Sequence, residues 1–218
     1  MKLSDVLARA QEKVREAYEL RTEVQKASRR VIKLAKRAIF AAHRRELTEA
    51  RELLAEARSE LVKLRELLME RPDVAGLGIL NPAYQELAEA EVFSALMAGS
   101  EPPAPEDIGI PHDQYLLGLA DVIGELRRQA LEAMRDGKLA DAERFLSLME
   151  EIYMELISLD EAQAILSELR HKCDIGRRLI EATRGEIAVE ARRAALREAL
   201  ARLEEALARG SSAGSVQA

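Results

Sequence analysis

Two pairs of carboxylates are spaced so that each pair falls on one face of a helix. Asp121 and Glu125 are four residues apart, and Glu86 and Glu89 are three apart. Residues at these spacings are neighbours on a helix surface. Like charges there destabilise a helix slightly, and burying a carboxylate without a partner costs more. We therefore expect these acids to pair with Lys or Arg, to share protons or to bind a cation.

The two pairs lie on different predicted helices, one over 81–98 and one over 112–136. If these helices pack side by side, the four carboxylates converge, and so much negative charge is unfavourable without a cation. Ligation by oxygen alone suits Mg²⁺ or Mn²⁺ rather than Zn²⁺. Such a metal beside a phosphate-binding surface would support phosphodiester hydrolysis. The alternative, in which arginines from neighbouring helices pair with the acids, stays open.

A stripe of basic residues lies on the first predicted helix. No Asp or Glu occurs from Lys26 to Arg45. The basic residues of this stretch fall within an arc of about 140° at helical spacing: Lys26, Arg29, Arg30, Lys33, Lys36, Arg37, His43 and Arg44, with Phe40 among them. A solvated face usually mixes both signs, so the stripe favours phosphate neutralisation with base stacking. The candidate phosphate-binding residues are Arg30, Lys33, Arg37 and Arg44, although a plain solvated face remains possible.

Other chemistries fit less well. A di-iron bundle needs two Glu-x-x-His motifs, and only Glu168 with His171 matches. No glycine-rich phosphate loop of the P-loop or Rossmann type is present. The single cysteine, Cys173, excludes an intrachain disulfide and is expected to be a packing residue.

Composition indicates the fold that must position these side chains. The 218 residues contain no Trp and only 3% aromatic residues, while Ala, Glu, Leu and Arg are frequent; these are good helix formers. The net charge of −6 excludes a global basic field. No apolar run approaches the roughly 20 residues of a membrane span, and acids throughout the N-terminal segment argue against a signal peptide. We expect a soluble, cytoplasmic, all-α protein.

Apolar periodicity and breaker residues divide the chain into helices. We expect them over about 4–45, 47–70, 81–98, 112–136 and 139–159, and over 161–209 as one helix or a pair. The stretches 73–80 and 99–111 are expected to be loops, 1–209 a single domain, and 210–218 a disordered tail. Gly118 and Gly124 each cost roughly 1 kcal/mol inside a helix, which suggests that a neighbouring backbone approaches closely there.

Several stretches resemble the translin family, in particular its factor-X branch. YLLGLADVIGELRR (Tyr115–Arg128) is similar to the signature helix of the family, SRRVIKLAKRAIFAAHR (Ser28–Arg44) to its first helix, and YQELAEAEVF (Tyr84–Phe93) to its Glu-x-x-Glu helix. A late segment, Leu169–Glu186, matches more loosely. The resemblance covers most of residues 20–190 in the right order. The loop 99–111 is much shorter than in the eukaryotic factor.

The resemblance implies a bundle of about seven helices, an α-α superhelix that assembles into a hollow, roughly octameric barrel. It implies binding of single-stranded RNA and DNA. In the factor-X branch it also implies a Mg²⁺-dependent endoribonuclease, whose acids correspond to Glu86, Glu89, Asp121 and Glu125. Our hypothesis is therefore a homo-oligomer that binds single-stranded nucleic acid and cuts RNA at this four-carboxylate site. The alternative is a binding oligomer whose acids are structural.

Overall fold

The described part of the chain is built from α-helices. The computed structural model describes residues 2–71 and 78–214, and within them it contains seven helices and no strand. The helices are α1 (Leu3–His43), α2 (Leu47–Met69), α4 (Asn81–Ala98), α5 (His112–Arg135), α6 (Leu139–Ile157), α7 (Asp160–Ile165) and α8 (Ser167–Gly214). The prediction of an all-α protein of about seven helices is confirmed, although α7 has only six residues.

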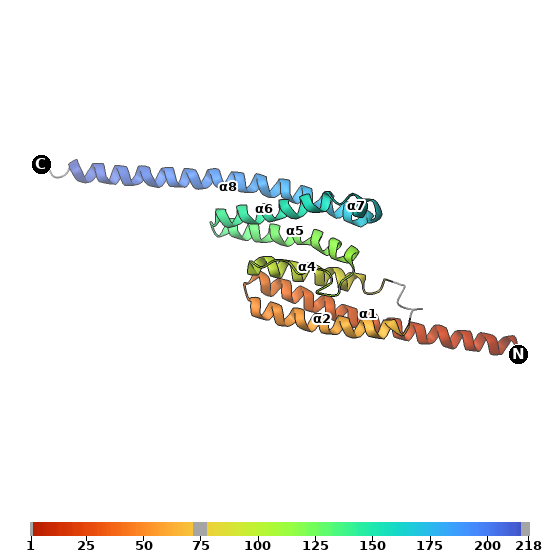
Figure 1. The fold of residues 1–218 in the computed structure, drawn as a ribbon. Coiled ribbons are helices and arrows are strands. Elements are labelled where there is room, and N and C mark those ends of the chain that lie inside the picture. Colours follow the sequence, from red (N-terminus) through yellow and green to blue (C-terminus); the bar gives the residue numbers. More distant parts are fainter. Residues whose placement is uncertain (1, 72–77, 215–218) are drawn as a thin grey trace.

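The helices form two groups that meet at one junction. α1, α2 and α4 pack on one another, as do α5, α6 and α8, and α4 packs against α5 between the two groups. Figure 1 shows this order as a stack of roughly parallel axes, from α2 and α1 through α4 and α5 to α6 and α8. The two helices that carry the acid pairs are therefore direct neighbours, as the predicted convergence requires.

Small aliphatic side chains make the core, because few aromatic residues are available. The buried face of α1 runs through Val24, Val31, Ala35, Ala38 and Ala42, all fully buried. The 3–4 spacing of these residues keeps them on one side of the helix. Alanines at this interface let the axes of α1, α2 and α4 lie close together, so the helices hold one another without large side chains.

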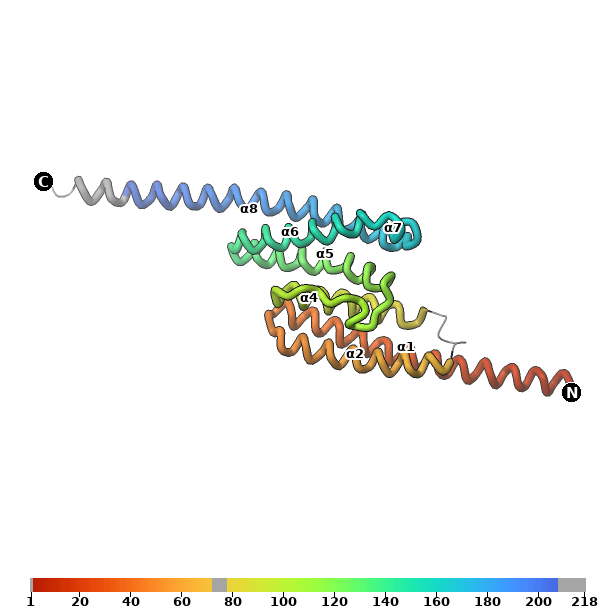
Figure 2. The backbone as a smooth tube through the Cα atoms, in the orientation of Figure 1, coloured from red at the N-terminus to blue at the C-terminus, as the bar shows by residue number. Residues whose placement is uncertain are grey.

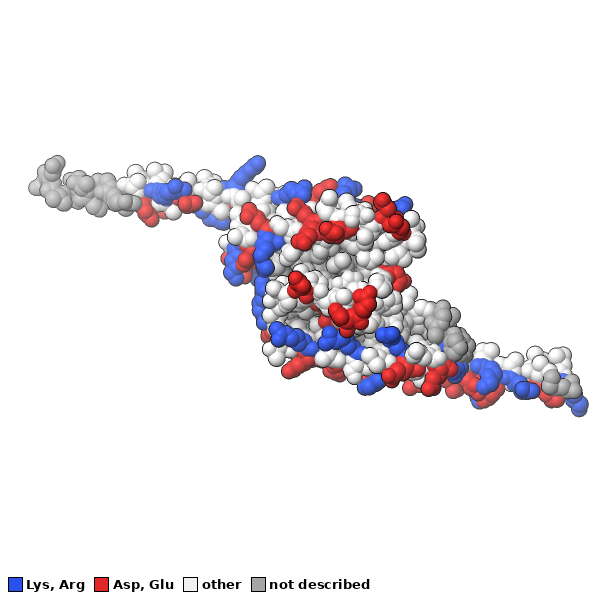
Figure 3. Space-filling model, in the orientation of Figure 1, with Lys and Arg blue, Asp and Glu red and all other residues white. Residues whose placement is uncertain are grey.

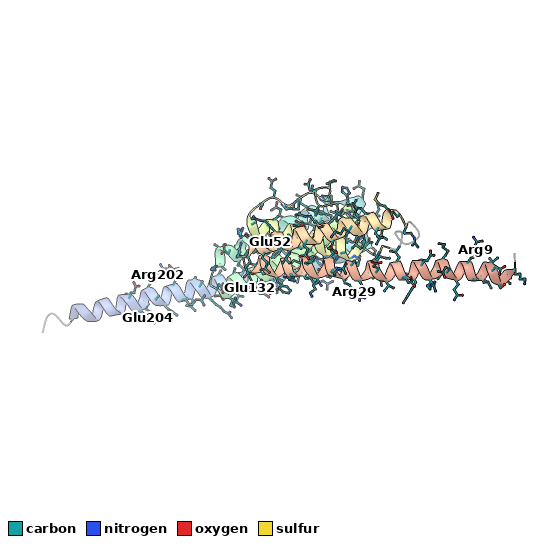
Figure 4. All side chains as sticks on the ribbon, turned by 90° about the horizontal axis from the view of Figure 1, so that it is seen from below. Arg9, Arg29, Glu52, Glu132, Arg202 and Glu204 are labelled. Carbon is teal, nitrogen blue, oxygen red and sulfur yellow. The ribbon has the colours of Figure 1, made fainter. Side chains whose placement is uncertain are left out.

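Both long helices extend beyond the packed body. The first twenty residues of α1 are mostly exposed, and so is α8 after Ile187. Figures 1 and 2 show these extensions leaving the body at opposite ends. In Figure 4, Arg9 lies on the extension of α1, and Arg202 and Glu204 lie on that of α8. Figure 3 shows Lys and Arg interspersed with Asp and Glu along both extensions.

The junction of α4 and α5 depends on a glycine. A Cβ atom at Gly118 would lie 2.5 Å from the carbonyl oxygen of Gln85 and 2.8 Å from the Cβ of Ala88. Only a residue without a side chain lets the backbone of α4 come so near, which confirms the prediction for Gly118. For Gly124 the prediction is wrong among the described residues, because a Cβ there would meet none of their atoms within 4 Å.

The later boundaries agree in part with those expected. The last predicted helix is a pair, because the chain turns at Leu166 between α7 and α8. α8 continues to Gly214, past the predicted start of the tail at 210, and residues 215–218 lie outside the described residues, so a disordered tail stays a prediction. The predicted loop 73–80 also falls mostly outside them. The single-domain assignment is untested.

In the part of the chain that the structure describes, every helix is either too short or too polar to cross a membrane.

We expect Gly118→Ala to destabilise the protein by about 1–3 kcal/mol, because the new methyl group overpacks the contact between α4 and α5. Gly124→Ala in the same helix is the matched control. It is exposed and has room for a methyl group, so it should stabilise the protein by about 0.5–1 kcal/mol. Urea unfolding of both variants measures the difference. Equal effects of the two substitutions would contradict a close contact at Gly118.

Candidate functional site

A pocket at the junction of the two helix groups collects residues from three helices. It has a volume of about 330 Å³. α1 contributes basic and apolar side chains, α4 two of the predicted acids, and α5 an acid and an arginine. The lining residues are Lys36, Ile39, Phe40, Glu86, Glu89, Glu125 and Arg128. The pocket thus joins part of the basic stripe to three of the four predicted acids.

Glu89 is half-buried, and its pKa reflects the other three acids around it. Burial, which contributes most, and the charges of Asp121, Glu86 and Glu125 together raise the pKa of its carboxyl to about 8. Within the described residues no hydrogen bond or ion pair holds this side chain, and only the field of Lys172 lowers its pKa. The acids therefore converge as predicted, and at neutral pH Glu89 keeps a proton in place of a cation.

Asp121 is held from both sides. The Nζ of Lys172 on α8 lies 2.7 Å from its Oδ1 and 2.8 Å from its Oδ2. The side-chain amide of Gln85 on α4 donates to the same Oδ2 at 2.6 Å. Both carboxylate oxygens are thus occupied. The sequence analysis identified neither Lys172 nor Gln85, although Gln85 directly precedes Glu86 on the helix that packs against Asp121.

Glu125 is held by a buried histidine. The side-chain amide of Gln129 donates to Nδ1 of His43 at 2.6 Å. The proton of the ring therefore sits on Nε2, which donates to Glu125. The ring also packs on Phe93, with centroids 4.6 Å apart. Including His43 in the exposed basic stripe was wrong, because its side chain is only 4% exposed and points into the junction.

The fourth acid, Glu86, pairs with Lys36 on α1 at 3.2 Å. Glu91, which lies on another face of α4 and is itself buried, instead pairs with the partly exposed Arg58 on α2 at 2.9 Å. Glu91 therefore belongs to the packing of α2 on α4 and not to the pocket. The alternative was that arginines from neighbouring helices pair with the acids. Three of the four acids do have partners, but these are two lysines and a histidine.

These partners affect whether the acids are arranged to coordinate a metal ion. Over 2–71 and 78–207, where side chains are described, no three acid, His or Cys side chains stand in an arrangement that could hold one. The reason is visible in the geometry, since Glu86, Asp121 and Glu125 each turn toward a donor of their own. The donor chemistry nevertheless fits a hard cation, because the site offers carboxylate oxygens and Glu89 is half-buried among like charges without a partner in that region.

The predicted phosphate-binding residues divide into two kinds. Arg30 pairs with Glu60 at 3.5 Å, and Arg44 pairs with Glu46 and Glu49, so both lean toward α2 or the turn before it. Lys33 and Arg37 are exposed and, among the residues with described side chains, have no acid within ion-pair distance.

The pocket itself takes two other members of the stripe, Lys36 and Phe40. The guanidinium of Arg128 lies 5.5 Å from the centre of the Phe40 ring. Arg128 closes the predicted signature stretch, yet its place beside Phe40 depends on how α5 packs on α1. The spacing of the residues therefore gave no sign of it.

Comparison with known proteins gives a consistent picture. The Translin family model matches residues 82–181. An uncharacterized protein of Methanocaldococcus jannaschii is 38% identical over 129 residues, which are 59% of this chain and 58% of that protein. The chain thus aligns with little more than half of this relative.

Solved structures match over a longer range. The structure of an AfC3PO–duplex RNA complex has a TM-score of 0.74 and 30% identity, covering 85% of this chain and 96% of that chain. A second AfC3PO structure gives 0.70 and 29% over the same shares. Apo-NeC3PO gives 0.75 at 23% identity, with 84% and 96% covered, and supports the fold alone.

Glu89 predicts how stability depends on pH. Its pKa in the folded protein, about 8, lies above the ordinary 4.5, so the folded state binds more protons than the unfolded state between these values. Stability should therefore fall as pH rises from about 4.5 to about 8. Glu89→Gln removes this loss, so its advantage over the wild type should grow across that window to a value on the order of a few kcal/mol.

Urea unfolding in EDTA between pH 5 and 9 measures this difference. The control is Glu52→Gln, an exposed acid of α2 (Figure 4) whose substitution should leave the pH profile unchanged. If the Glu89→Gln profile runs parallel to that of the wild type, Glu89 is not half-buried among like charges.

Proposed function

The chain belongs to the Translin family, and from this premise we propose that it is a homo-oligomer that binds single-stranded RNA and DNA and cuts RNA with the help of Mg²⁺ or Mn²⁺. The observation that carries the proposal is the position of Glu89. It is a half-buried carboxyl without a partner in the described part of the chain, surrounded by Glu86, Asp121 and Glu125 and facing a basic helix. Structural acids seldom converge in this way unless a cation joins them.

Each group in the pocket has a role that its position favours. Glu86, Glu89, Asp121 and Glu125 would hold the metal, which when bound supplies an activated water and stabilises charge on the leaving oxygen. Glu125 has a second possible role, orienting the attacking water while His43 fixes its carboxylate.

The basic side of the pocket would hold the nucleic acid. Lys36 stands where a phosphate would approach the acids, because its ammonium lies beside Glu86. The half-exposed ring of Phe40 offers a stacking surface for a base. Lys33 and Arg37 continue this positive surface along α1, and Arg30 and Arg44 add to it where their acid partners release them.

The comparisons support the binding part of the proposal. AfC3PO, which shares 30% of its residues with this chain, has been solved in a complex with duplex RNA. Duplex RNA therefore belongs among the substrates to be tested, beside single strands. Exposed apolar side chains on the two helix extensions, including Leu7, Val14, Leu196, Leu200 and Leu203, favour an oligomer that covers them.

The second candidate is a binding oligomer without catalysis. The observation that favours it is that Lys36, His43 and Lys172 already hold three of the four acids. In that case the acids would serve to join α4 and α5 to α1 and α8. Cleavage assays separate the two candidates directly.

We expect the Asp121→Asn/Glu125→Gln double variant to lose metal-dependent internal cleavage of end-labelled RNA by at least about 100-fold, since even outer-shell partners of a metal contribute 10–100-fold. RNA affinity should stay within about threefold, because it comes from phosphate contacts elsewhere. The control is Glu52→Gln/Glu56→Gln, an exposed acid pair of the same spacing on α2. Binding by the wild type without cuts in Mg²⁺ or Mn²⁺ would leave the second candidate.

The basic stripe has a test of its own. Lys33→Gln/Arg37→Gln should weaken binding of all single-stranded sequences alike. It should also lower the slope of log affinity against log salt by up to about 1.4, because each lost phosphate contact to a single strand accounts for about 0.7. Fluorescence anisotropy between 50 and 300 mM KCl measures the slope. Lys63→Gln, an exposed lysine of α2, serves as the control, and an unchanged slope in the double variant would exclude this surface.

A further inference from the structure

Lys172 connects the last long helix to the acid site. It lies on α8, one turn after Glu168, and its side chain is only 15% exposed. Its Nζ approaches both oxygens of Asp121, at 2.7 and 2.8 Å. Its charge also lowers the pKa of Glu89 against the effect of the three acids. Lys172 is thus the cation of the chain that contacts Asp121 directly.

A divalent ion and this ammonium cannot share Asp121 comfortably. Lys172 takes one position on each oxygen, and Gln85 takes a further one on Oδ2. A carboxylate offers about four such positions. A metal on the remaining position would stand within a few ångströms of the ammonium, and like charges so close repel strongly in a site shielded from water. Gln85 is neutral, so it can stay while the metal binds, whereas Lys172 has to leave.

The structure provides a place for Lys172 to go. Glu168 lies one helical turn earlier, and one of its oxygens is already 3.9 Å from the Nζ atom. Its side chain is 61% exposed, so it costs little to pair there. Both carboxylates are thus within reach of the ammonium, so Glu168 can replace Asp121 as its main partner.

We propose that Lys172 is a positioning residue that holds Asp121 in the metal-free site and moves to Glu168 when a divalent cation binds. The inference rests on the proposed function, since it requires the acids to be the metal site. It assigns to Lys172 and Glu168 opposite effects on metal affinity. Lys172 competes with the metal, and Glu168 draws the competitor away.

Titration of the metal-free protein with Mn²⁺ alone, followed by electron paramagnetic resonance of the free ion, tests this. Lys172→Met should bind Mn²⁺ about tenfold tighter or more, because a positive charge in direct contact with a ligand is removed. Glu168→Gln should bind it about two- to threefold more weakly, since Lys172 then has Asp121 as its main partner. Glu181→Gln, from the exposed pair with Arg177 on the same helix, is the control and should match the wild type.

Using two variants keeps the test informative even if one of them is destabilised. Lys172→Met leaves a half-buried carboxylate with fewer partners and so risks lower stability, whereas Glu168 is exposed and its substitution leaves the packing intact. Circular dichroism during thermal unfolding checks both proteins. Weaker binding by Lys172→Met, or tighter binding by Glu168→Gln, would overturn the inference.

The outcome also separates this inference from the function on which it rests. If Mn²⁺ binds the wild type and Glu89→Gln or Asp121→Asn abolishes that binding, the acids are the metal site. An unchanged affinity in Lys172→Met then overturns only the role of the lysine. If Mn²⁺ binding is insensitive to all four acids, the metal site itself is wrong and the inference falls with it.

Discussion

The close approach of α4 and α5 at Gly118 is the contact on which the rest of the structure depends. With the carbonyl of Gln85 only 2.5 Å from where a Cβ would be, the two helices bring their acids together across the junction. The same contact joins the two groups of three helices. This close contact decides how the two groups of helices are joined. It also decides how much negative charge is gathered between them.

The charges at this junction are balanced by residues from the outer helices. α1 supplies the ammonium of Lys36 and a hydrogen bond from His43, and α8 supplies the ammonium of Lys172. Each of the three paired acids is thereby tied to a helix other than its own: Glu86 and Glu125 to α1, and Asp121 to α8. These polar contacts also hold α1 and α8 in place. Glu89 has no such tie within the described residues and carries a proton instead. The acids of the site are therefore held by these contacts and by the proton on Glu89.

The orientation of α1 about its own axis decides which of its residues line the site and which are exposed. Residues of the basic stripe that are close in sequence face different neighbours: Lys36 and Phe40 enter the pocket, Arg30 turns toward α2, and His43 is buried. One helix therefore serves as core, site wall and exposed basic surface at once. Its alanine-rich buried face makes this possible, because small side chains let α4 and α2 pack on it closely while the long basic side chains reach outward.

The helices, the two acid pairs and their place on adjacent helices could be predicted from the sequence, because helical periodicity and the family's motifs are local in the chain. It also indicated the close contact at Gly118, since a glycine in a helix interior needs a reason. The partners of the acids were decided only by the tertiary structure. Lys172 lies 51 residues from Asp121 and His43 lies 82 from Glu125, and no spacing rule connects residues so far apart. Which face of α1 meets the junction depends on the packing of three helices at once, so the burial of His43 and the pairing of Lys36 followed from the fold and not from the pattern.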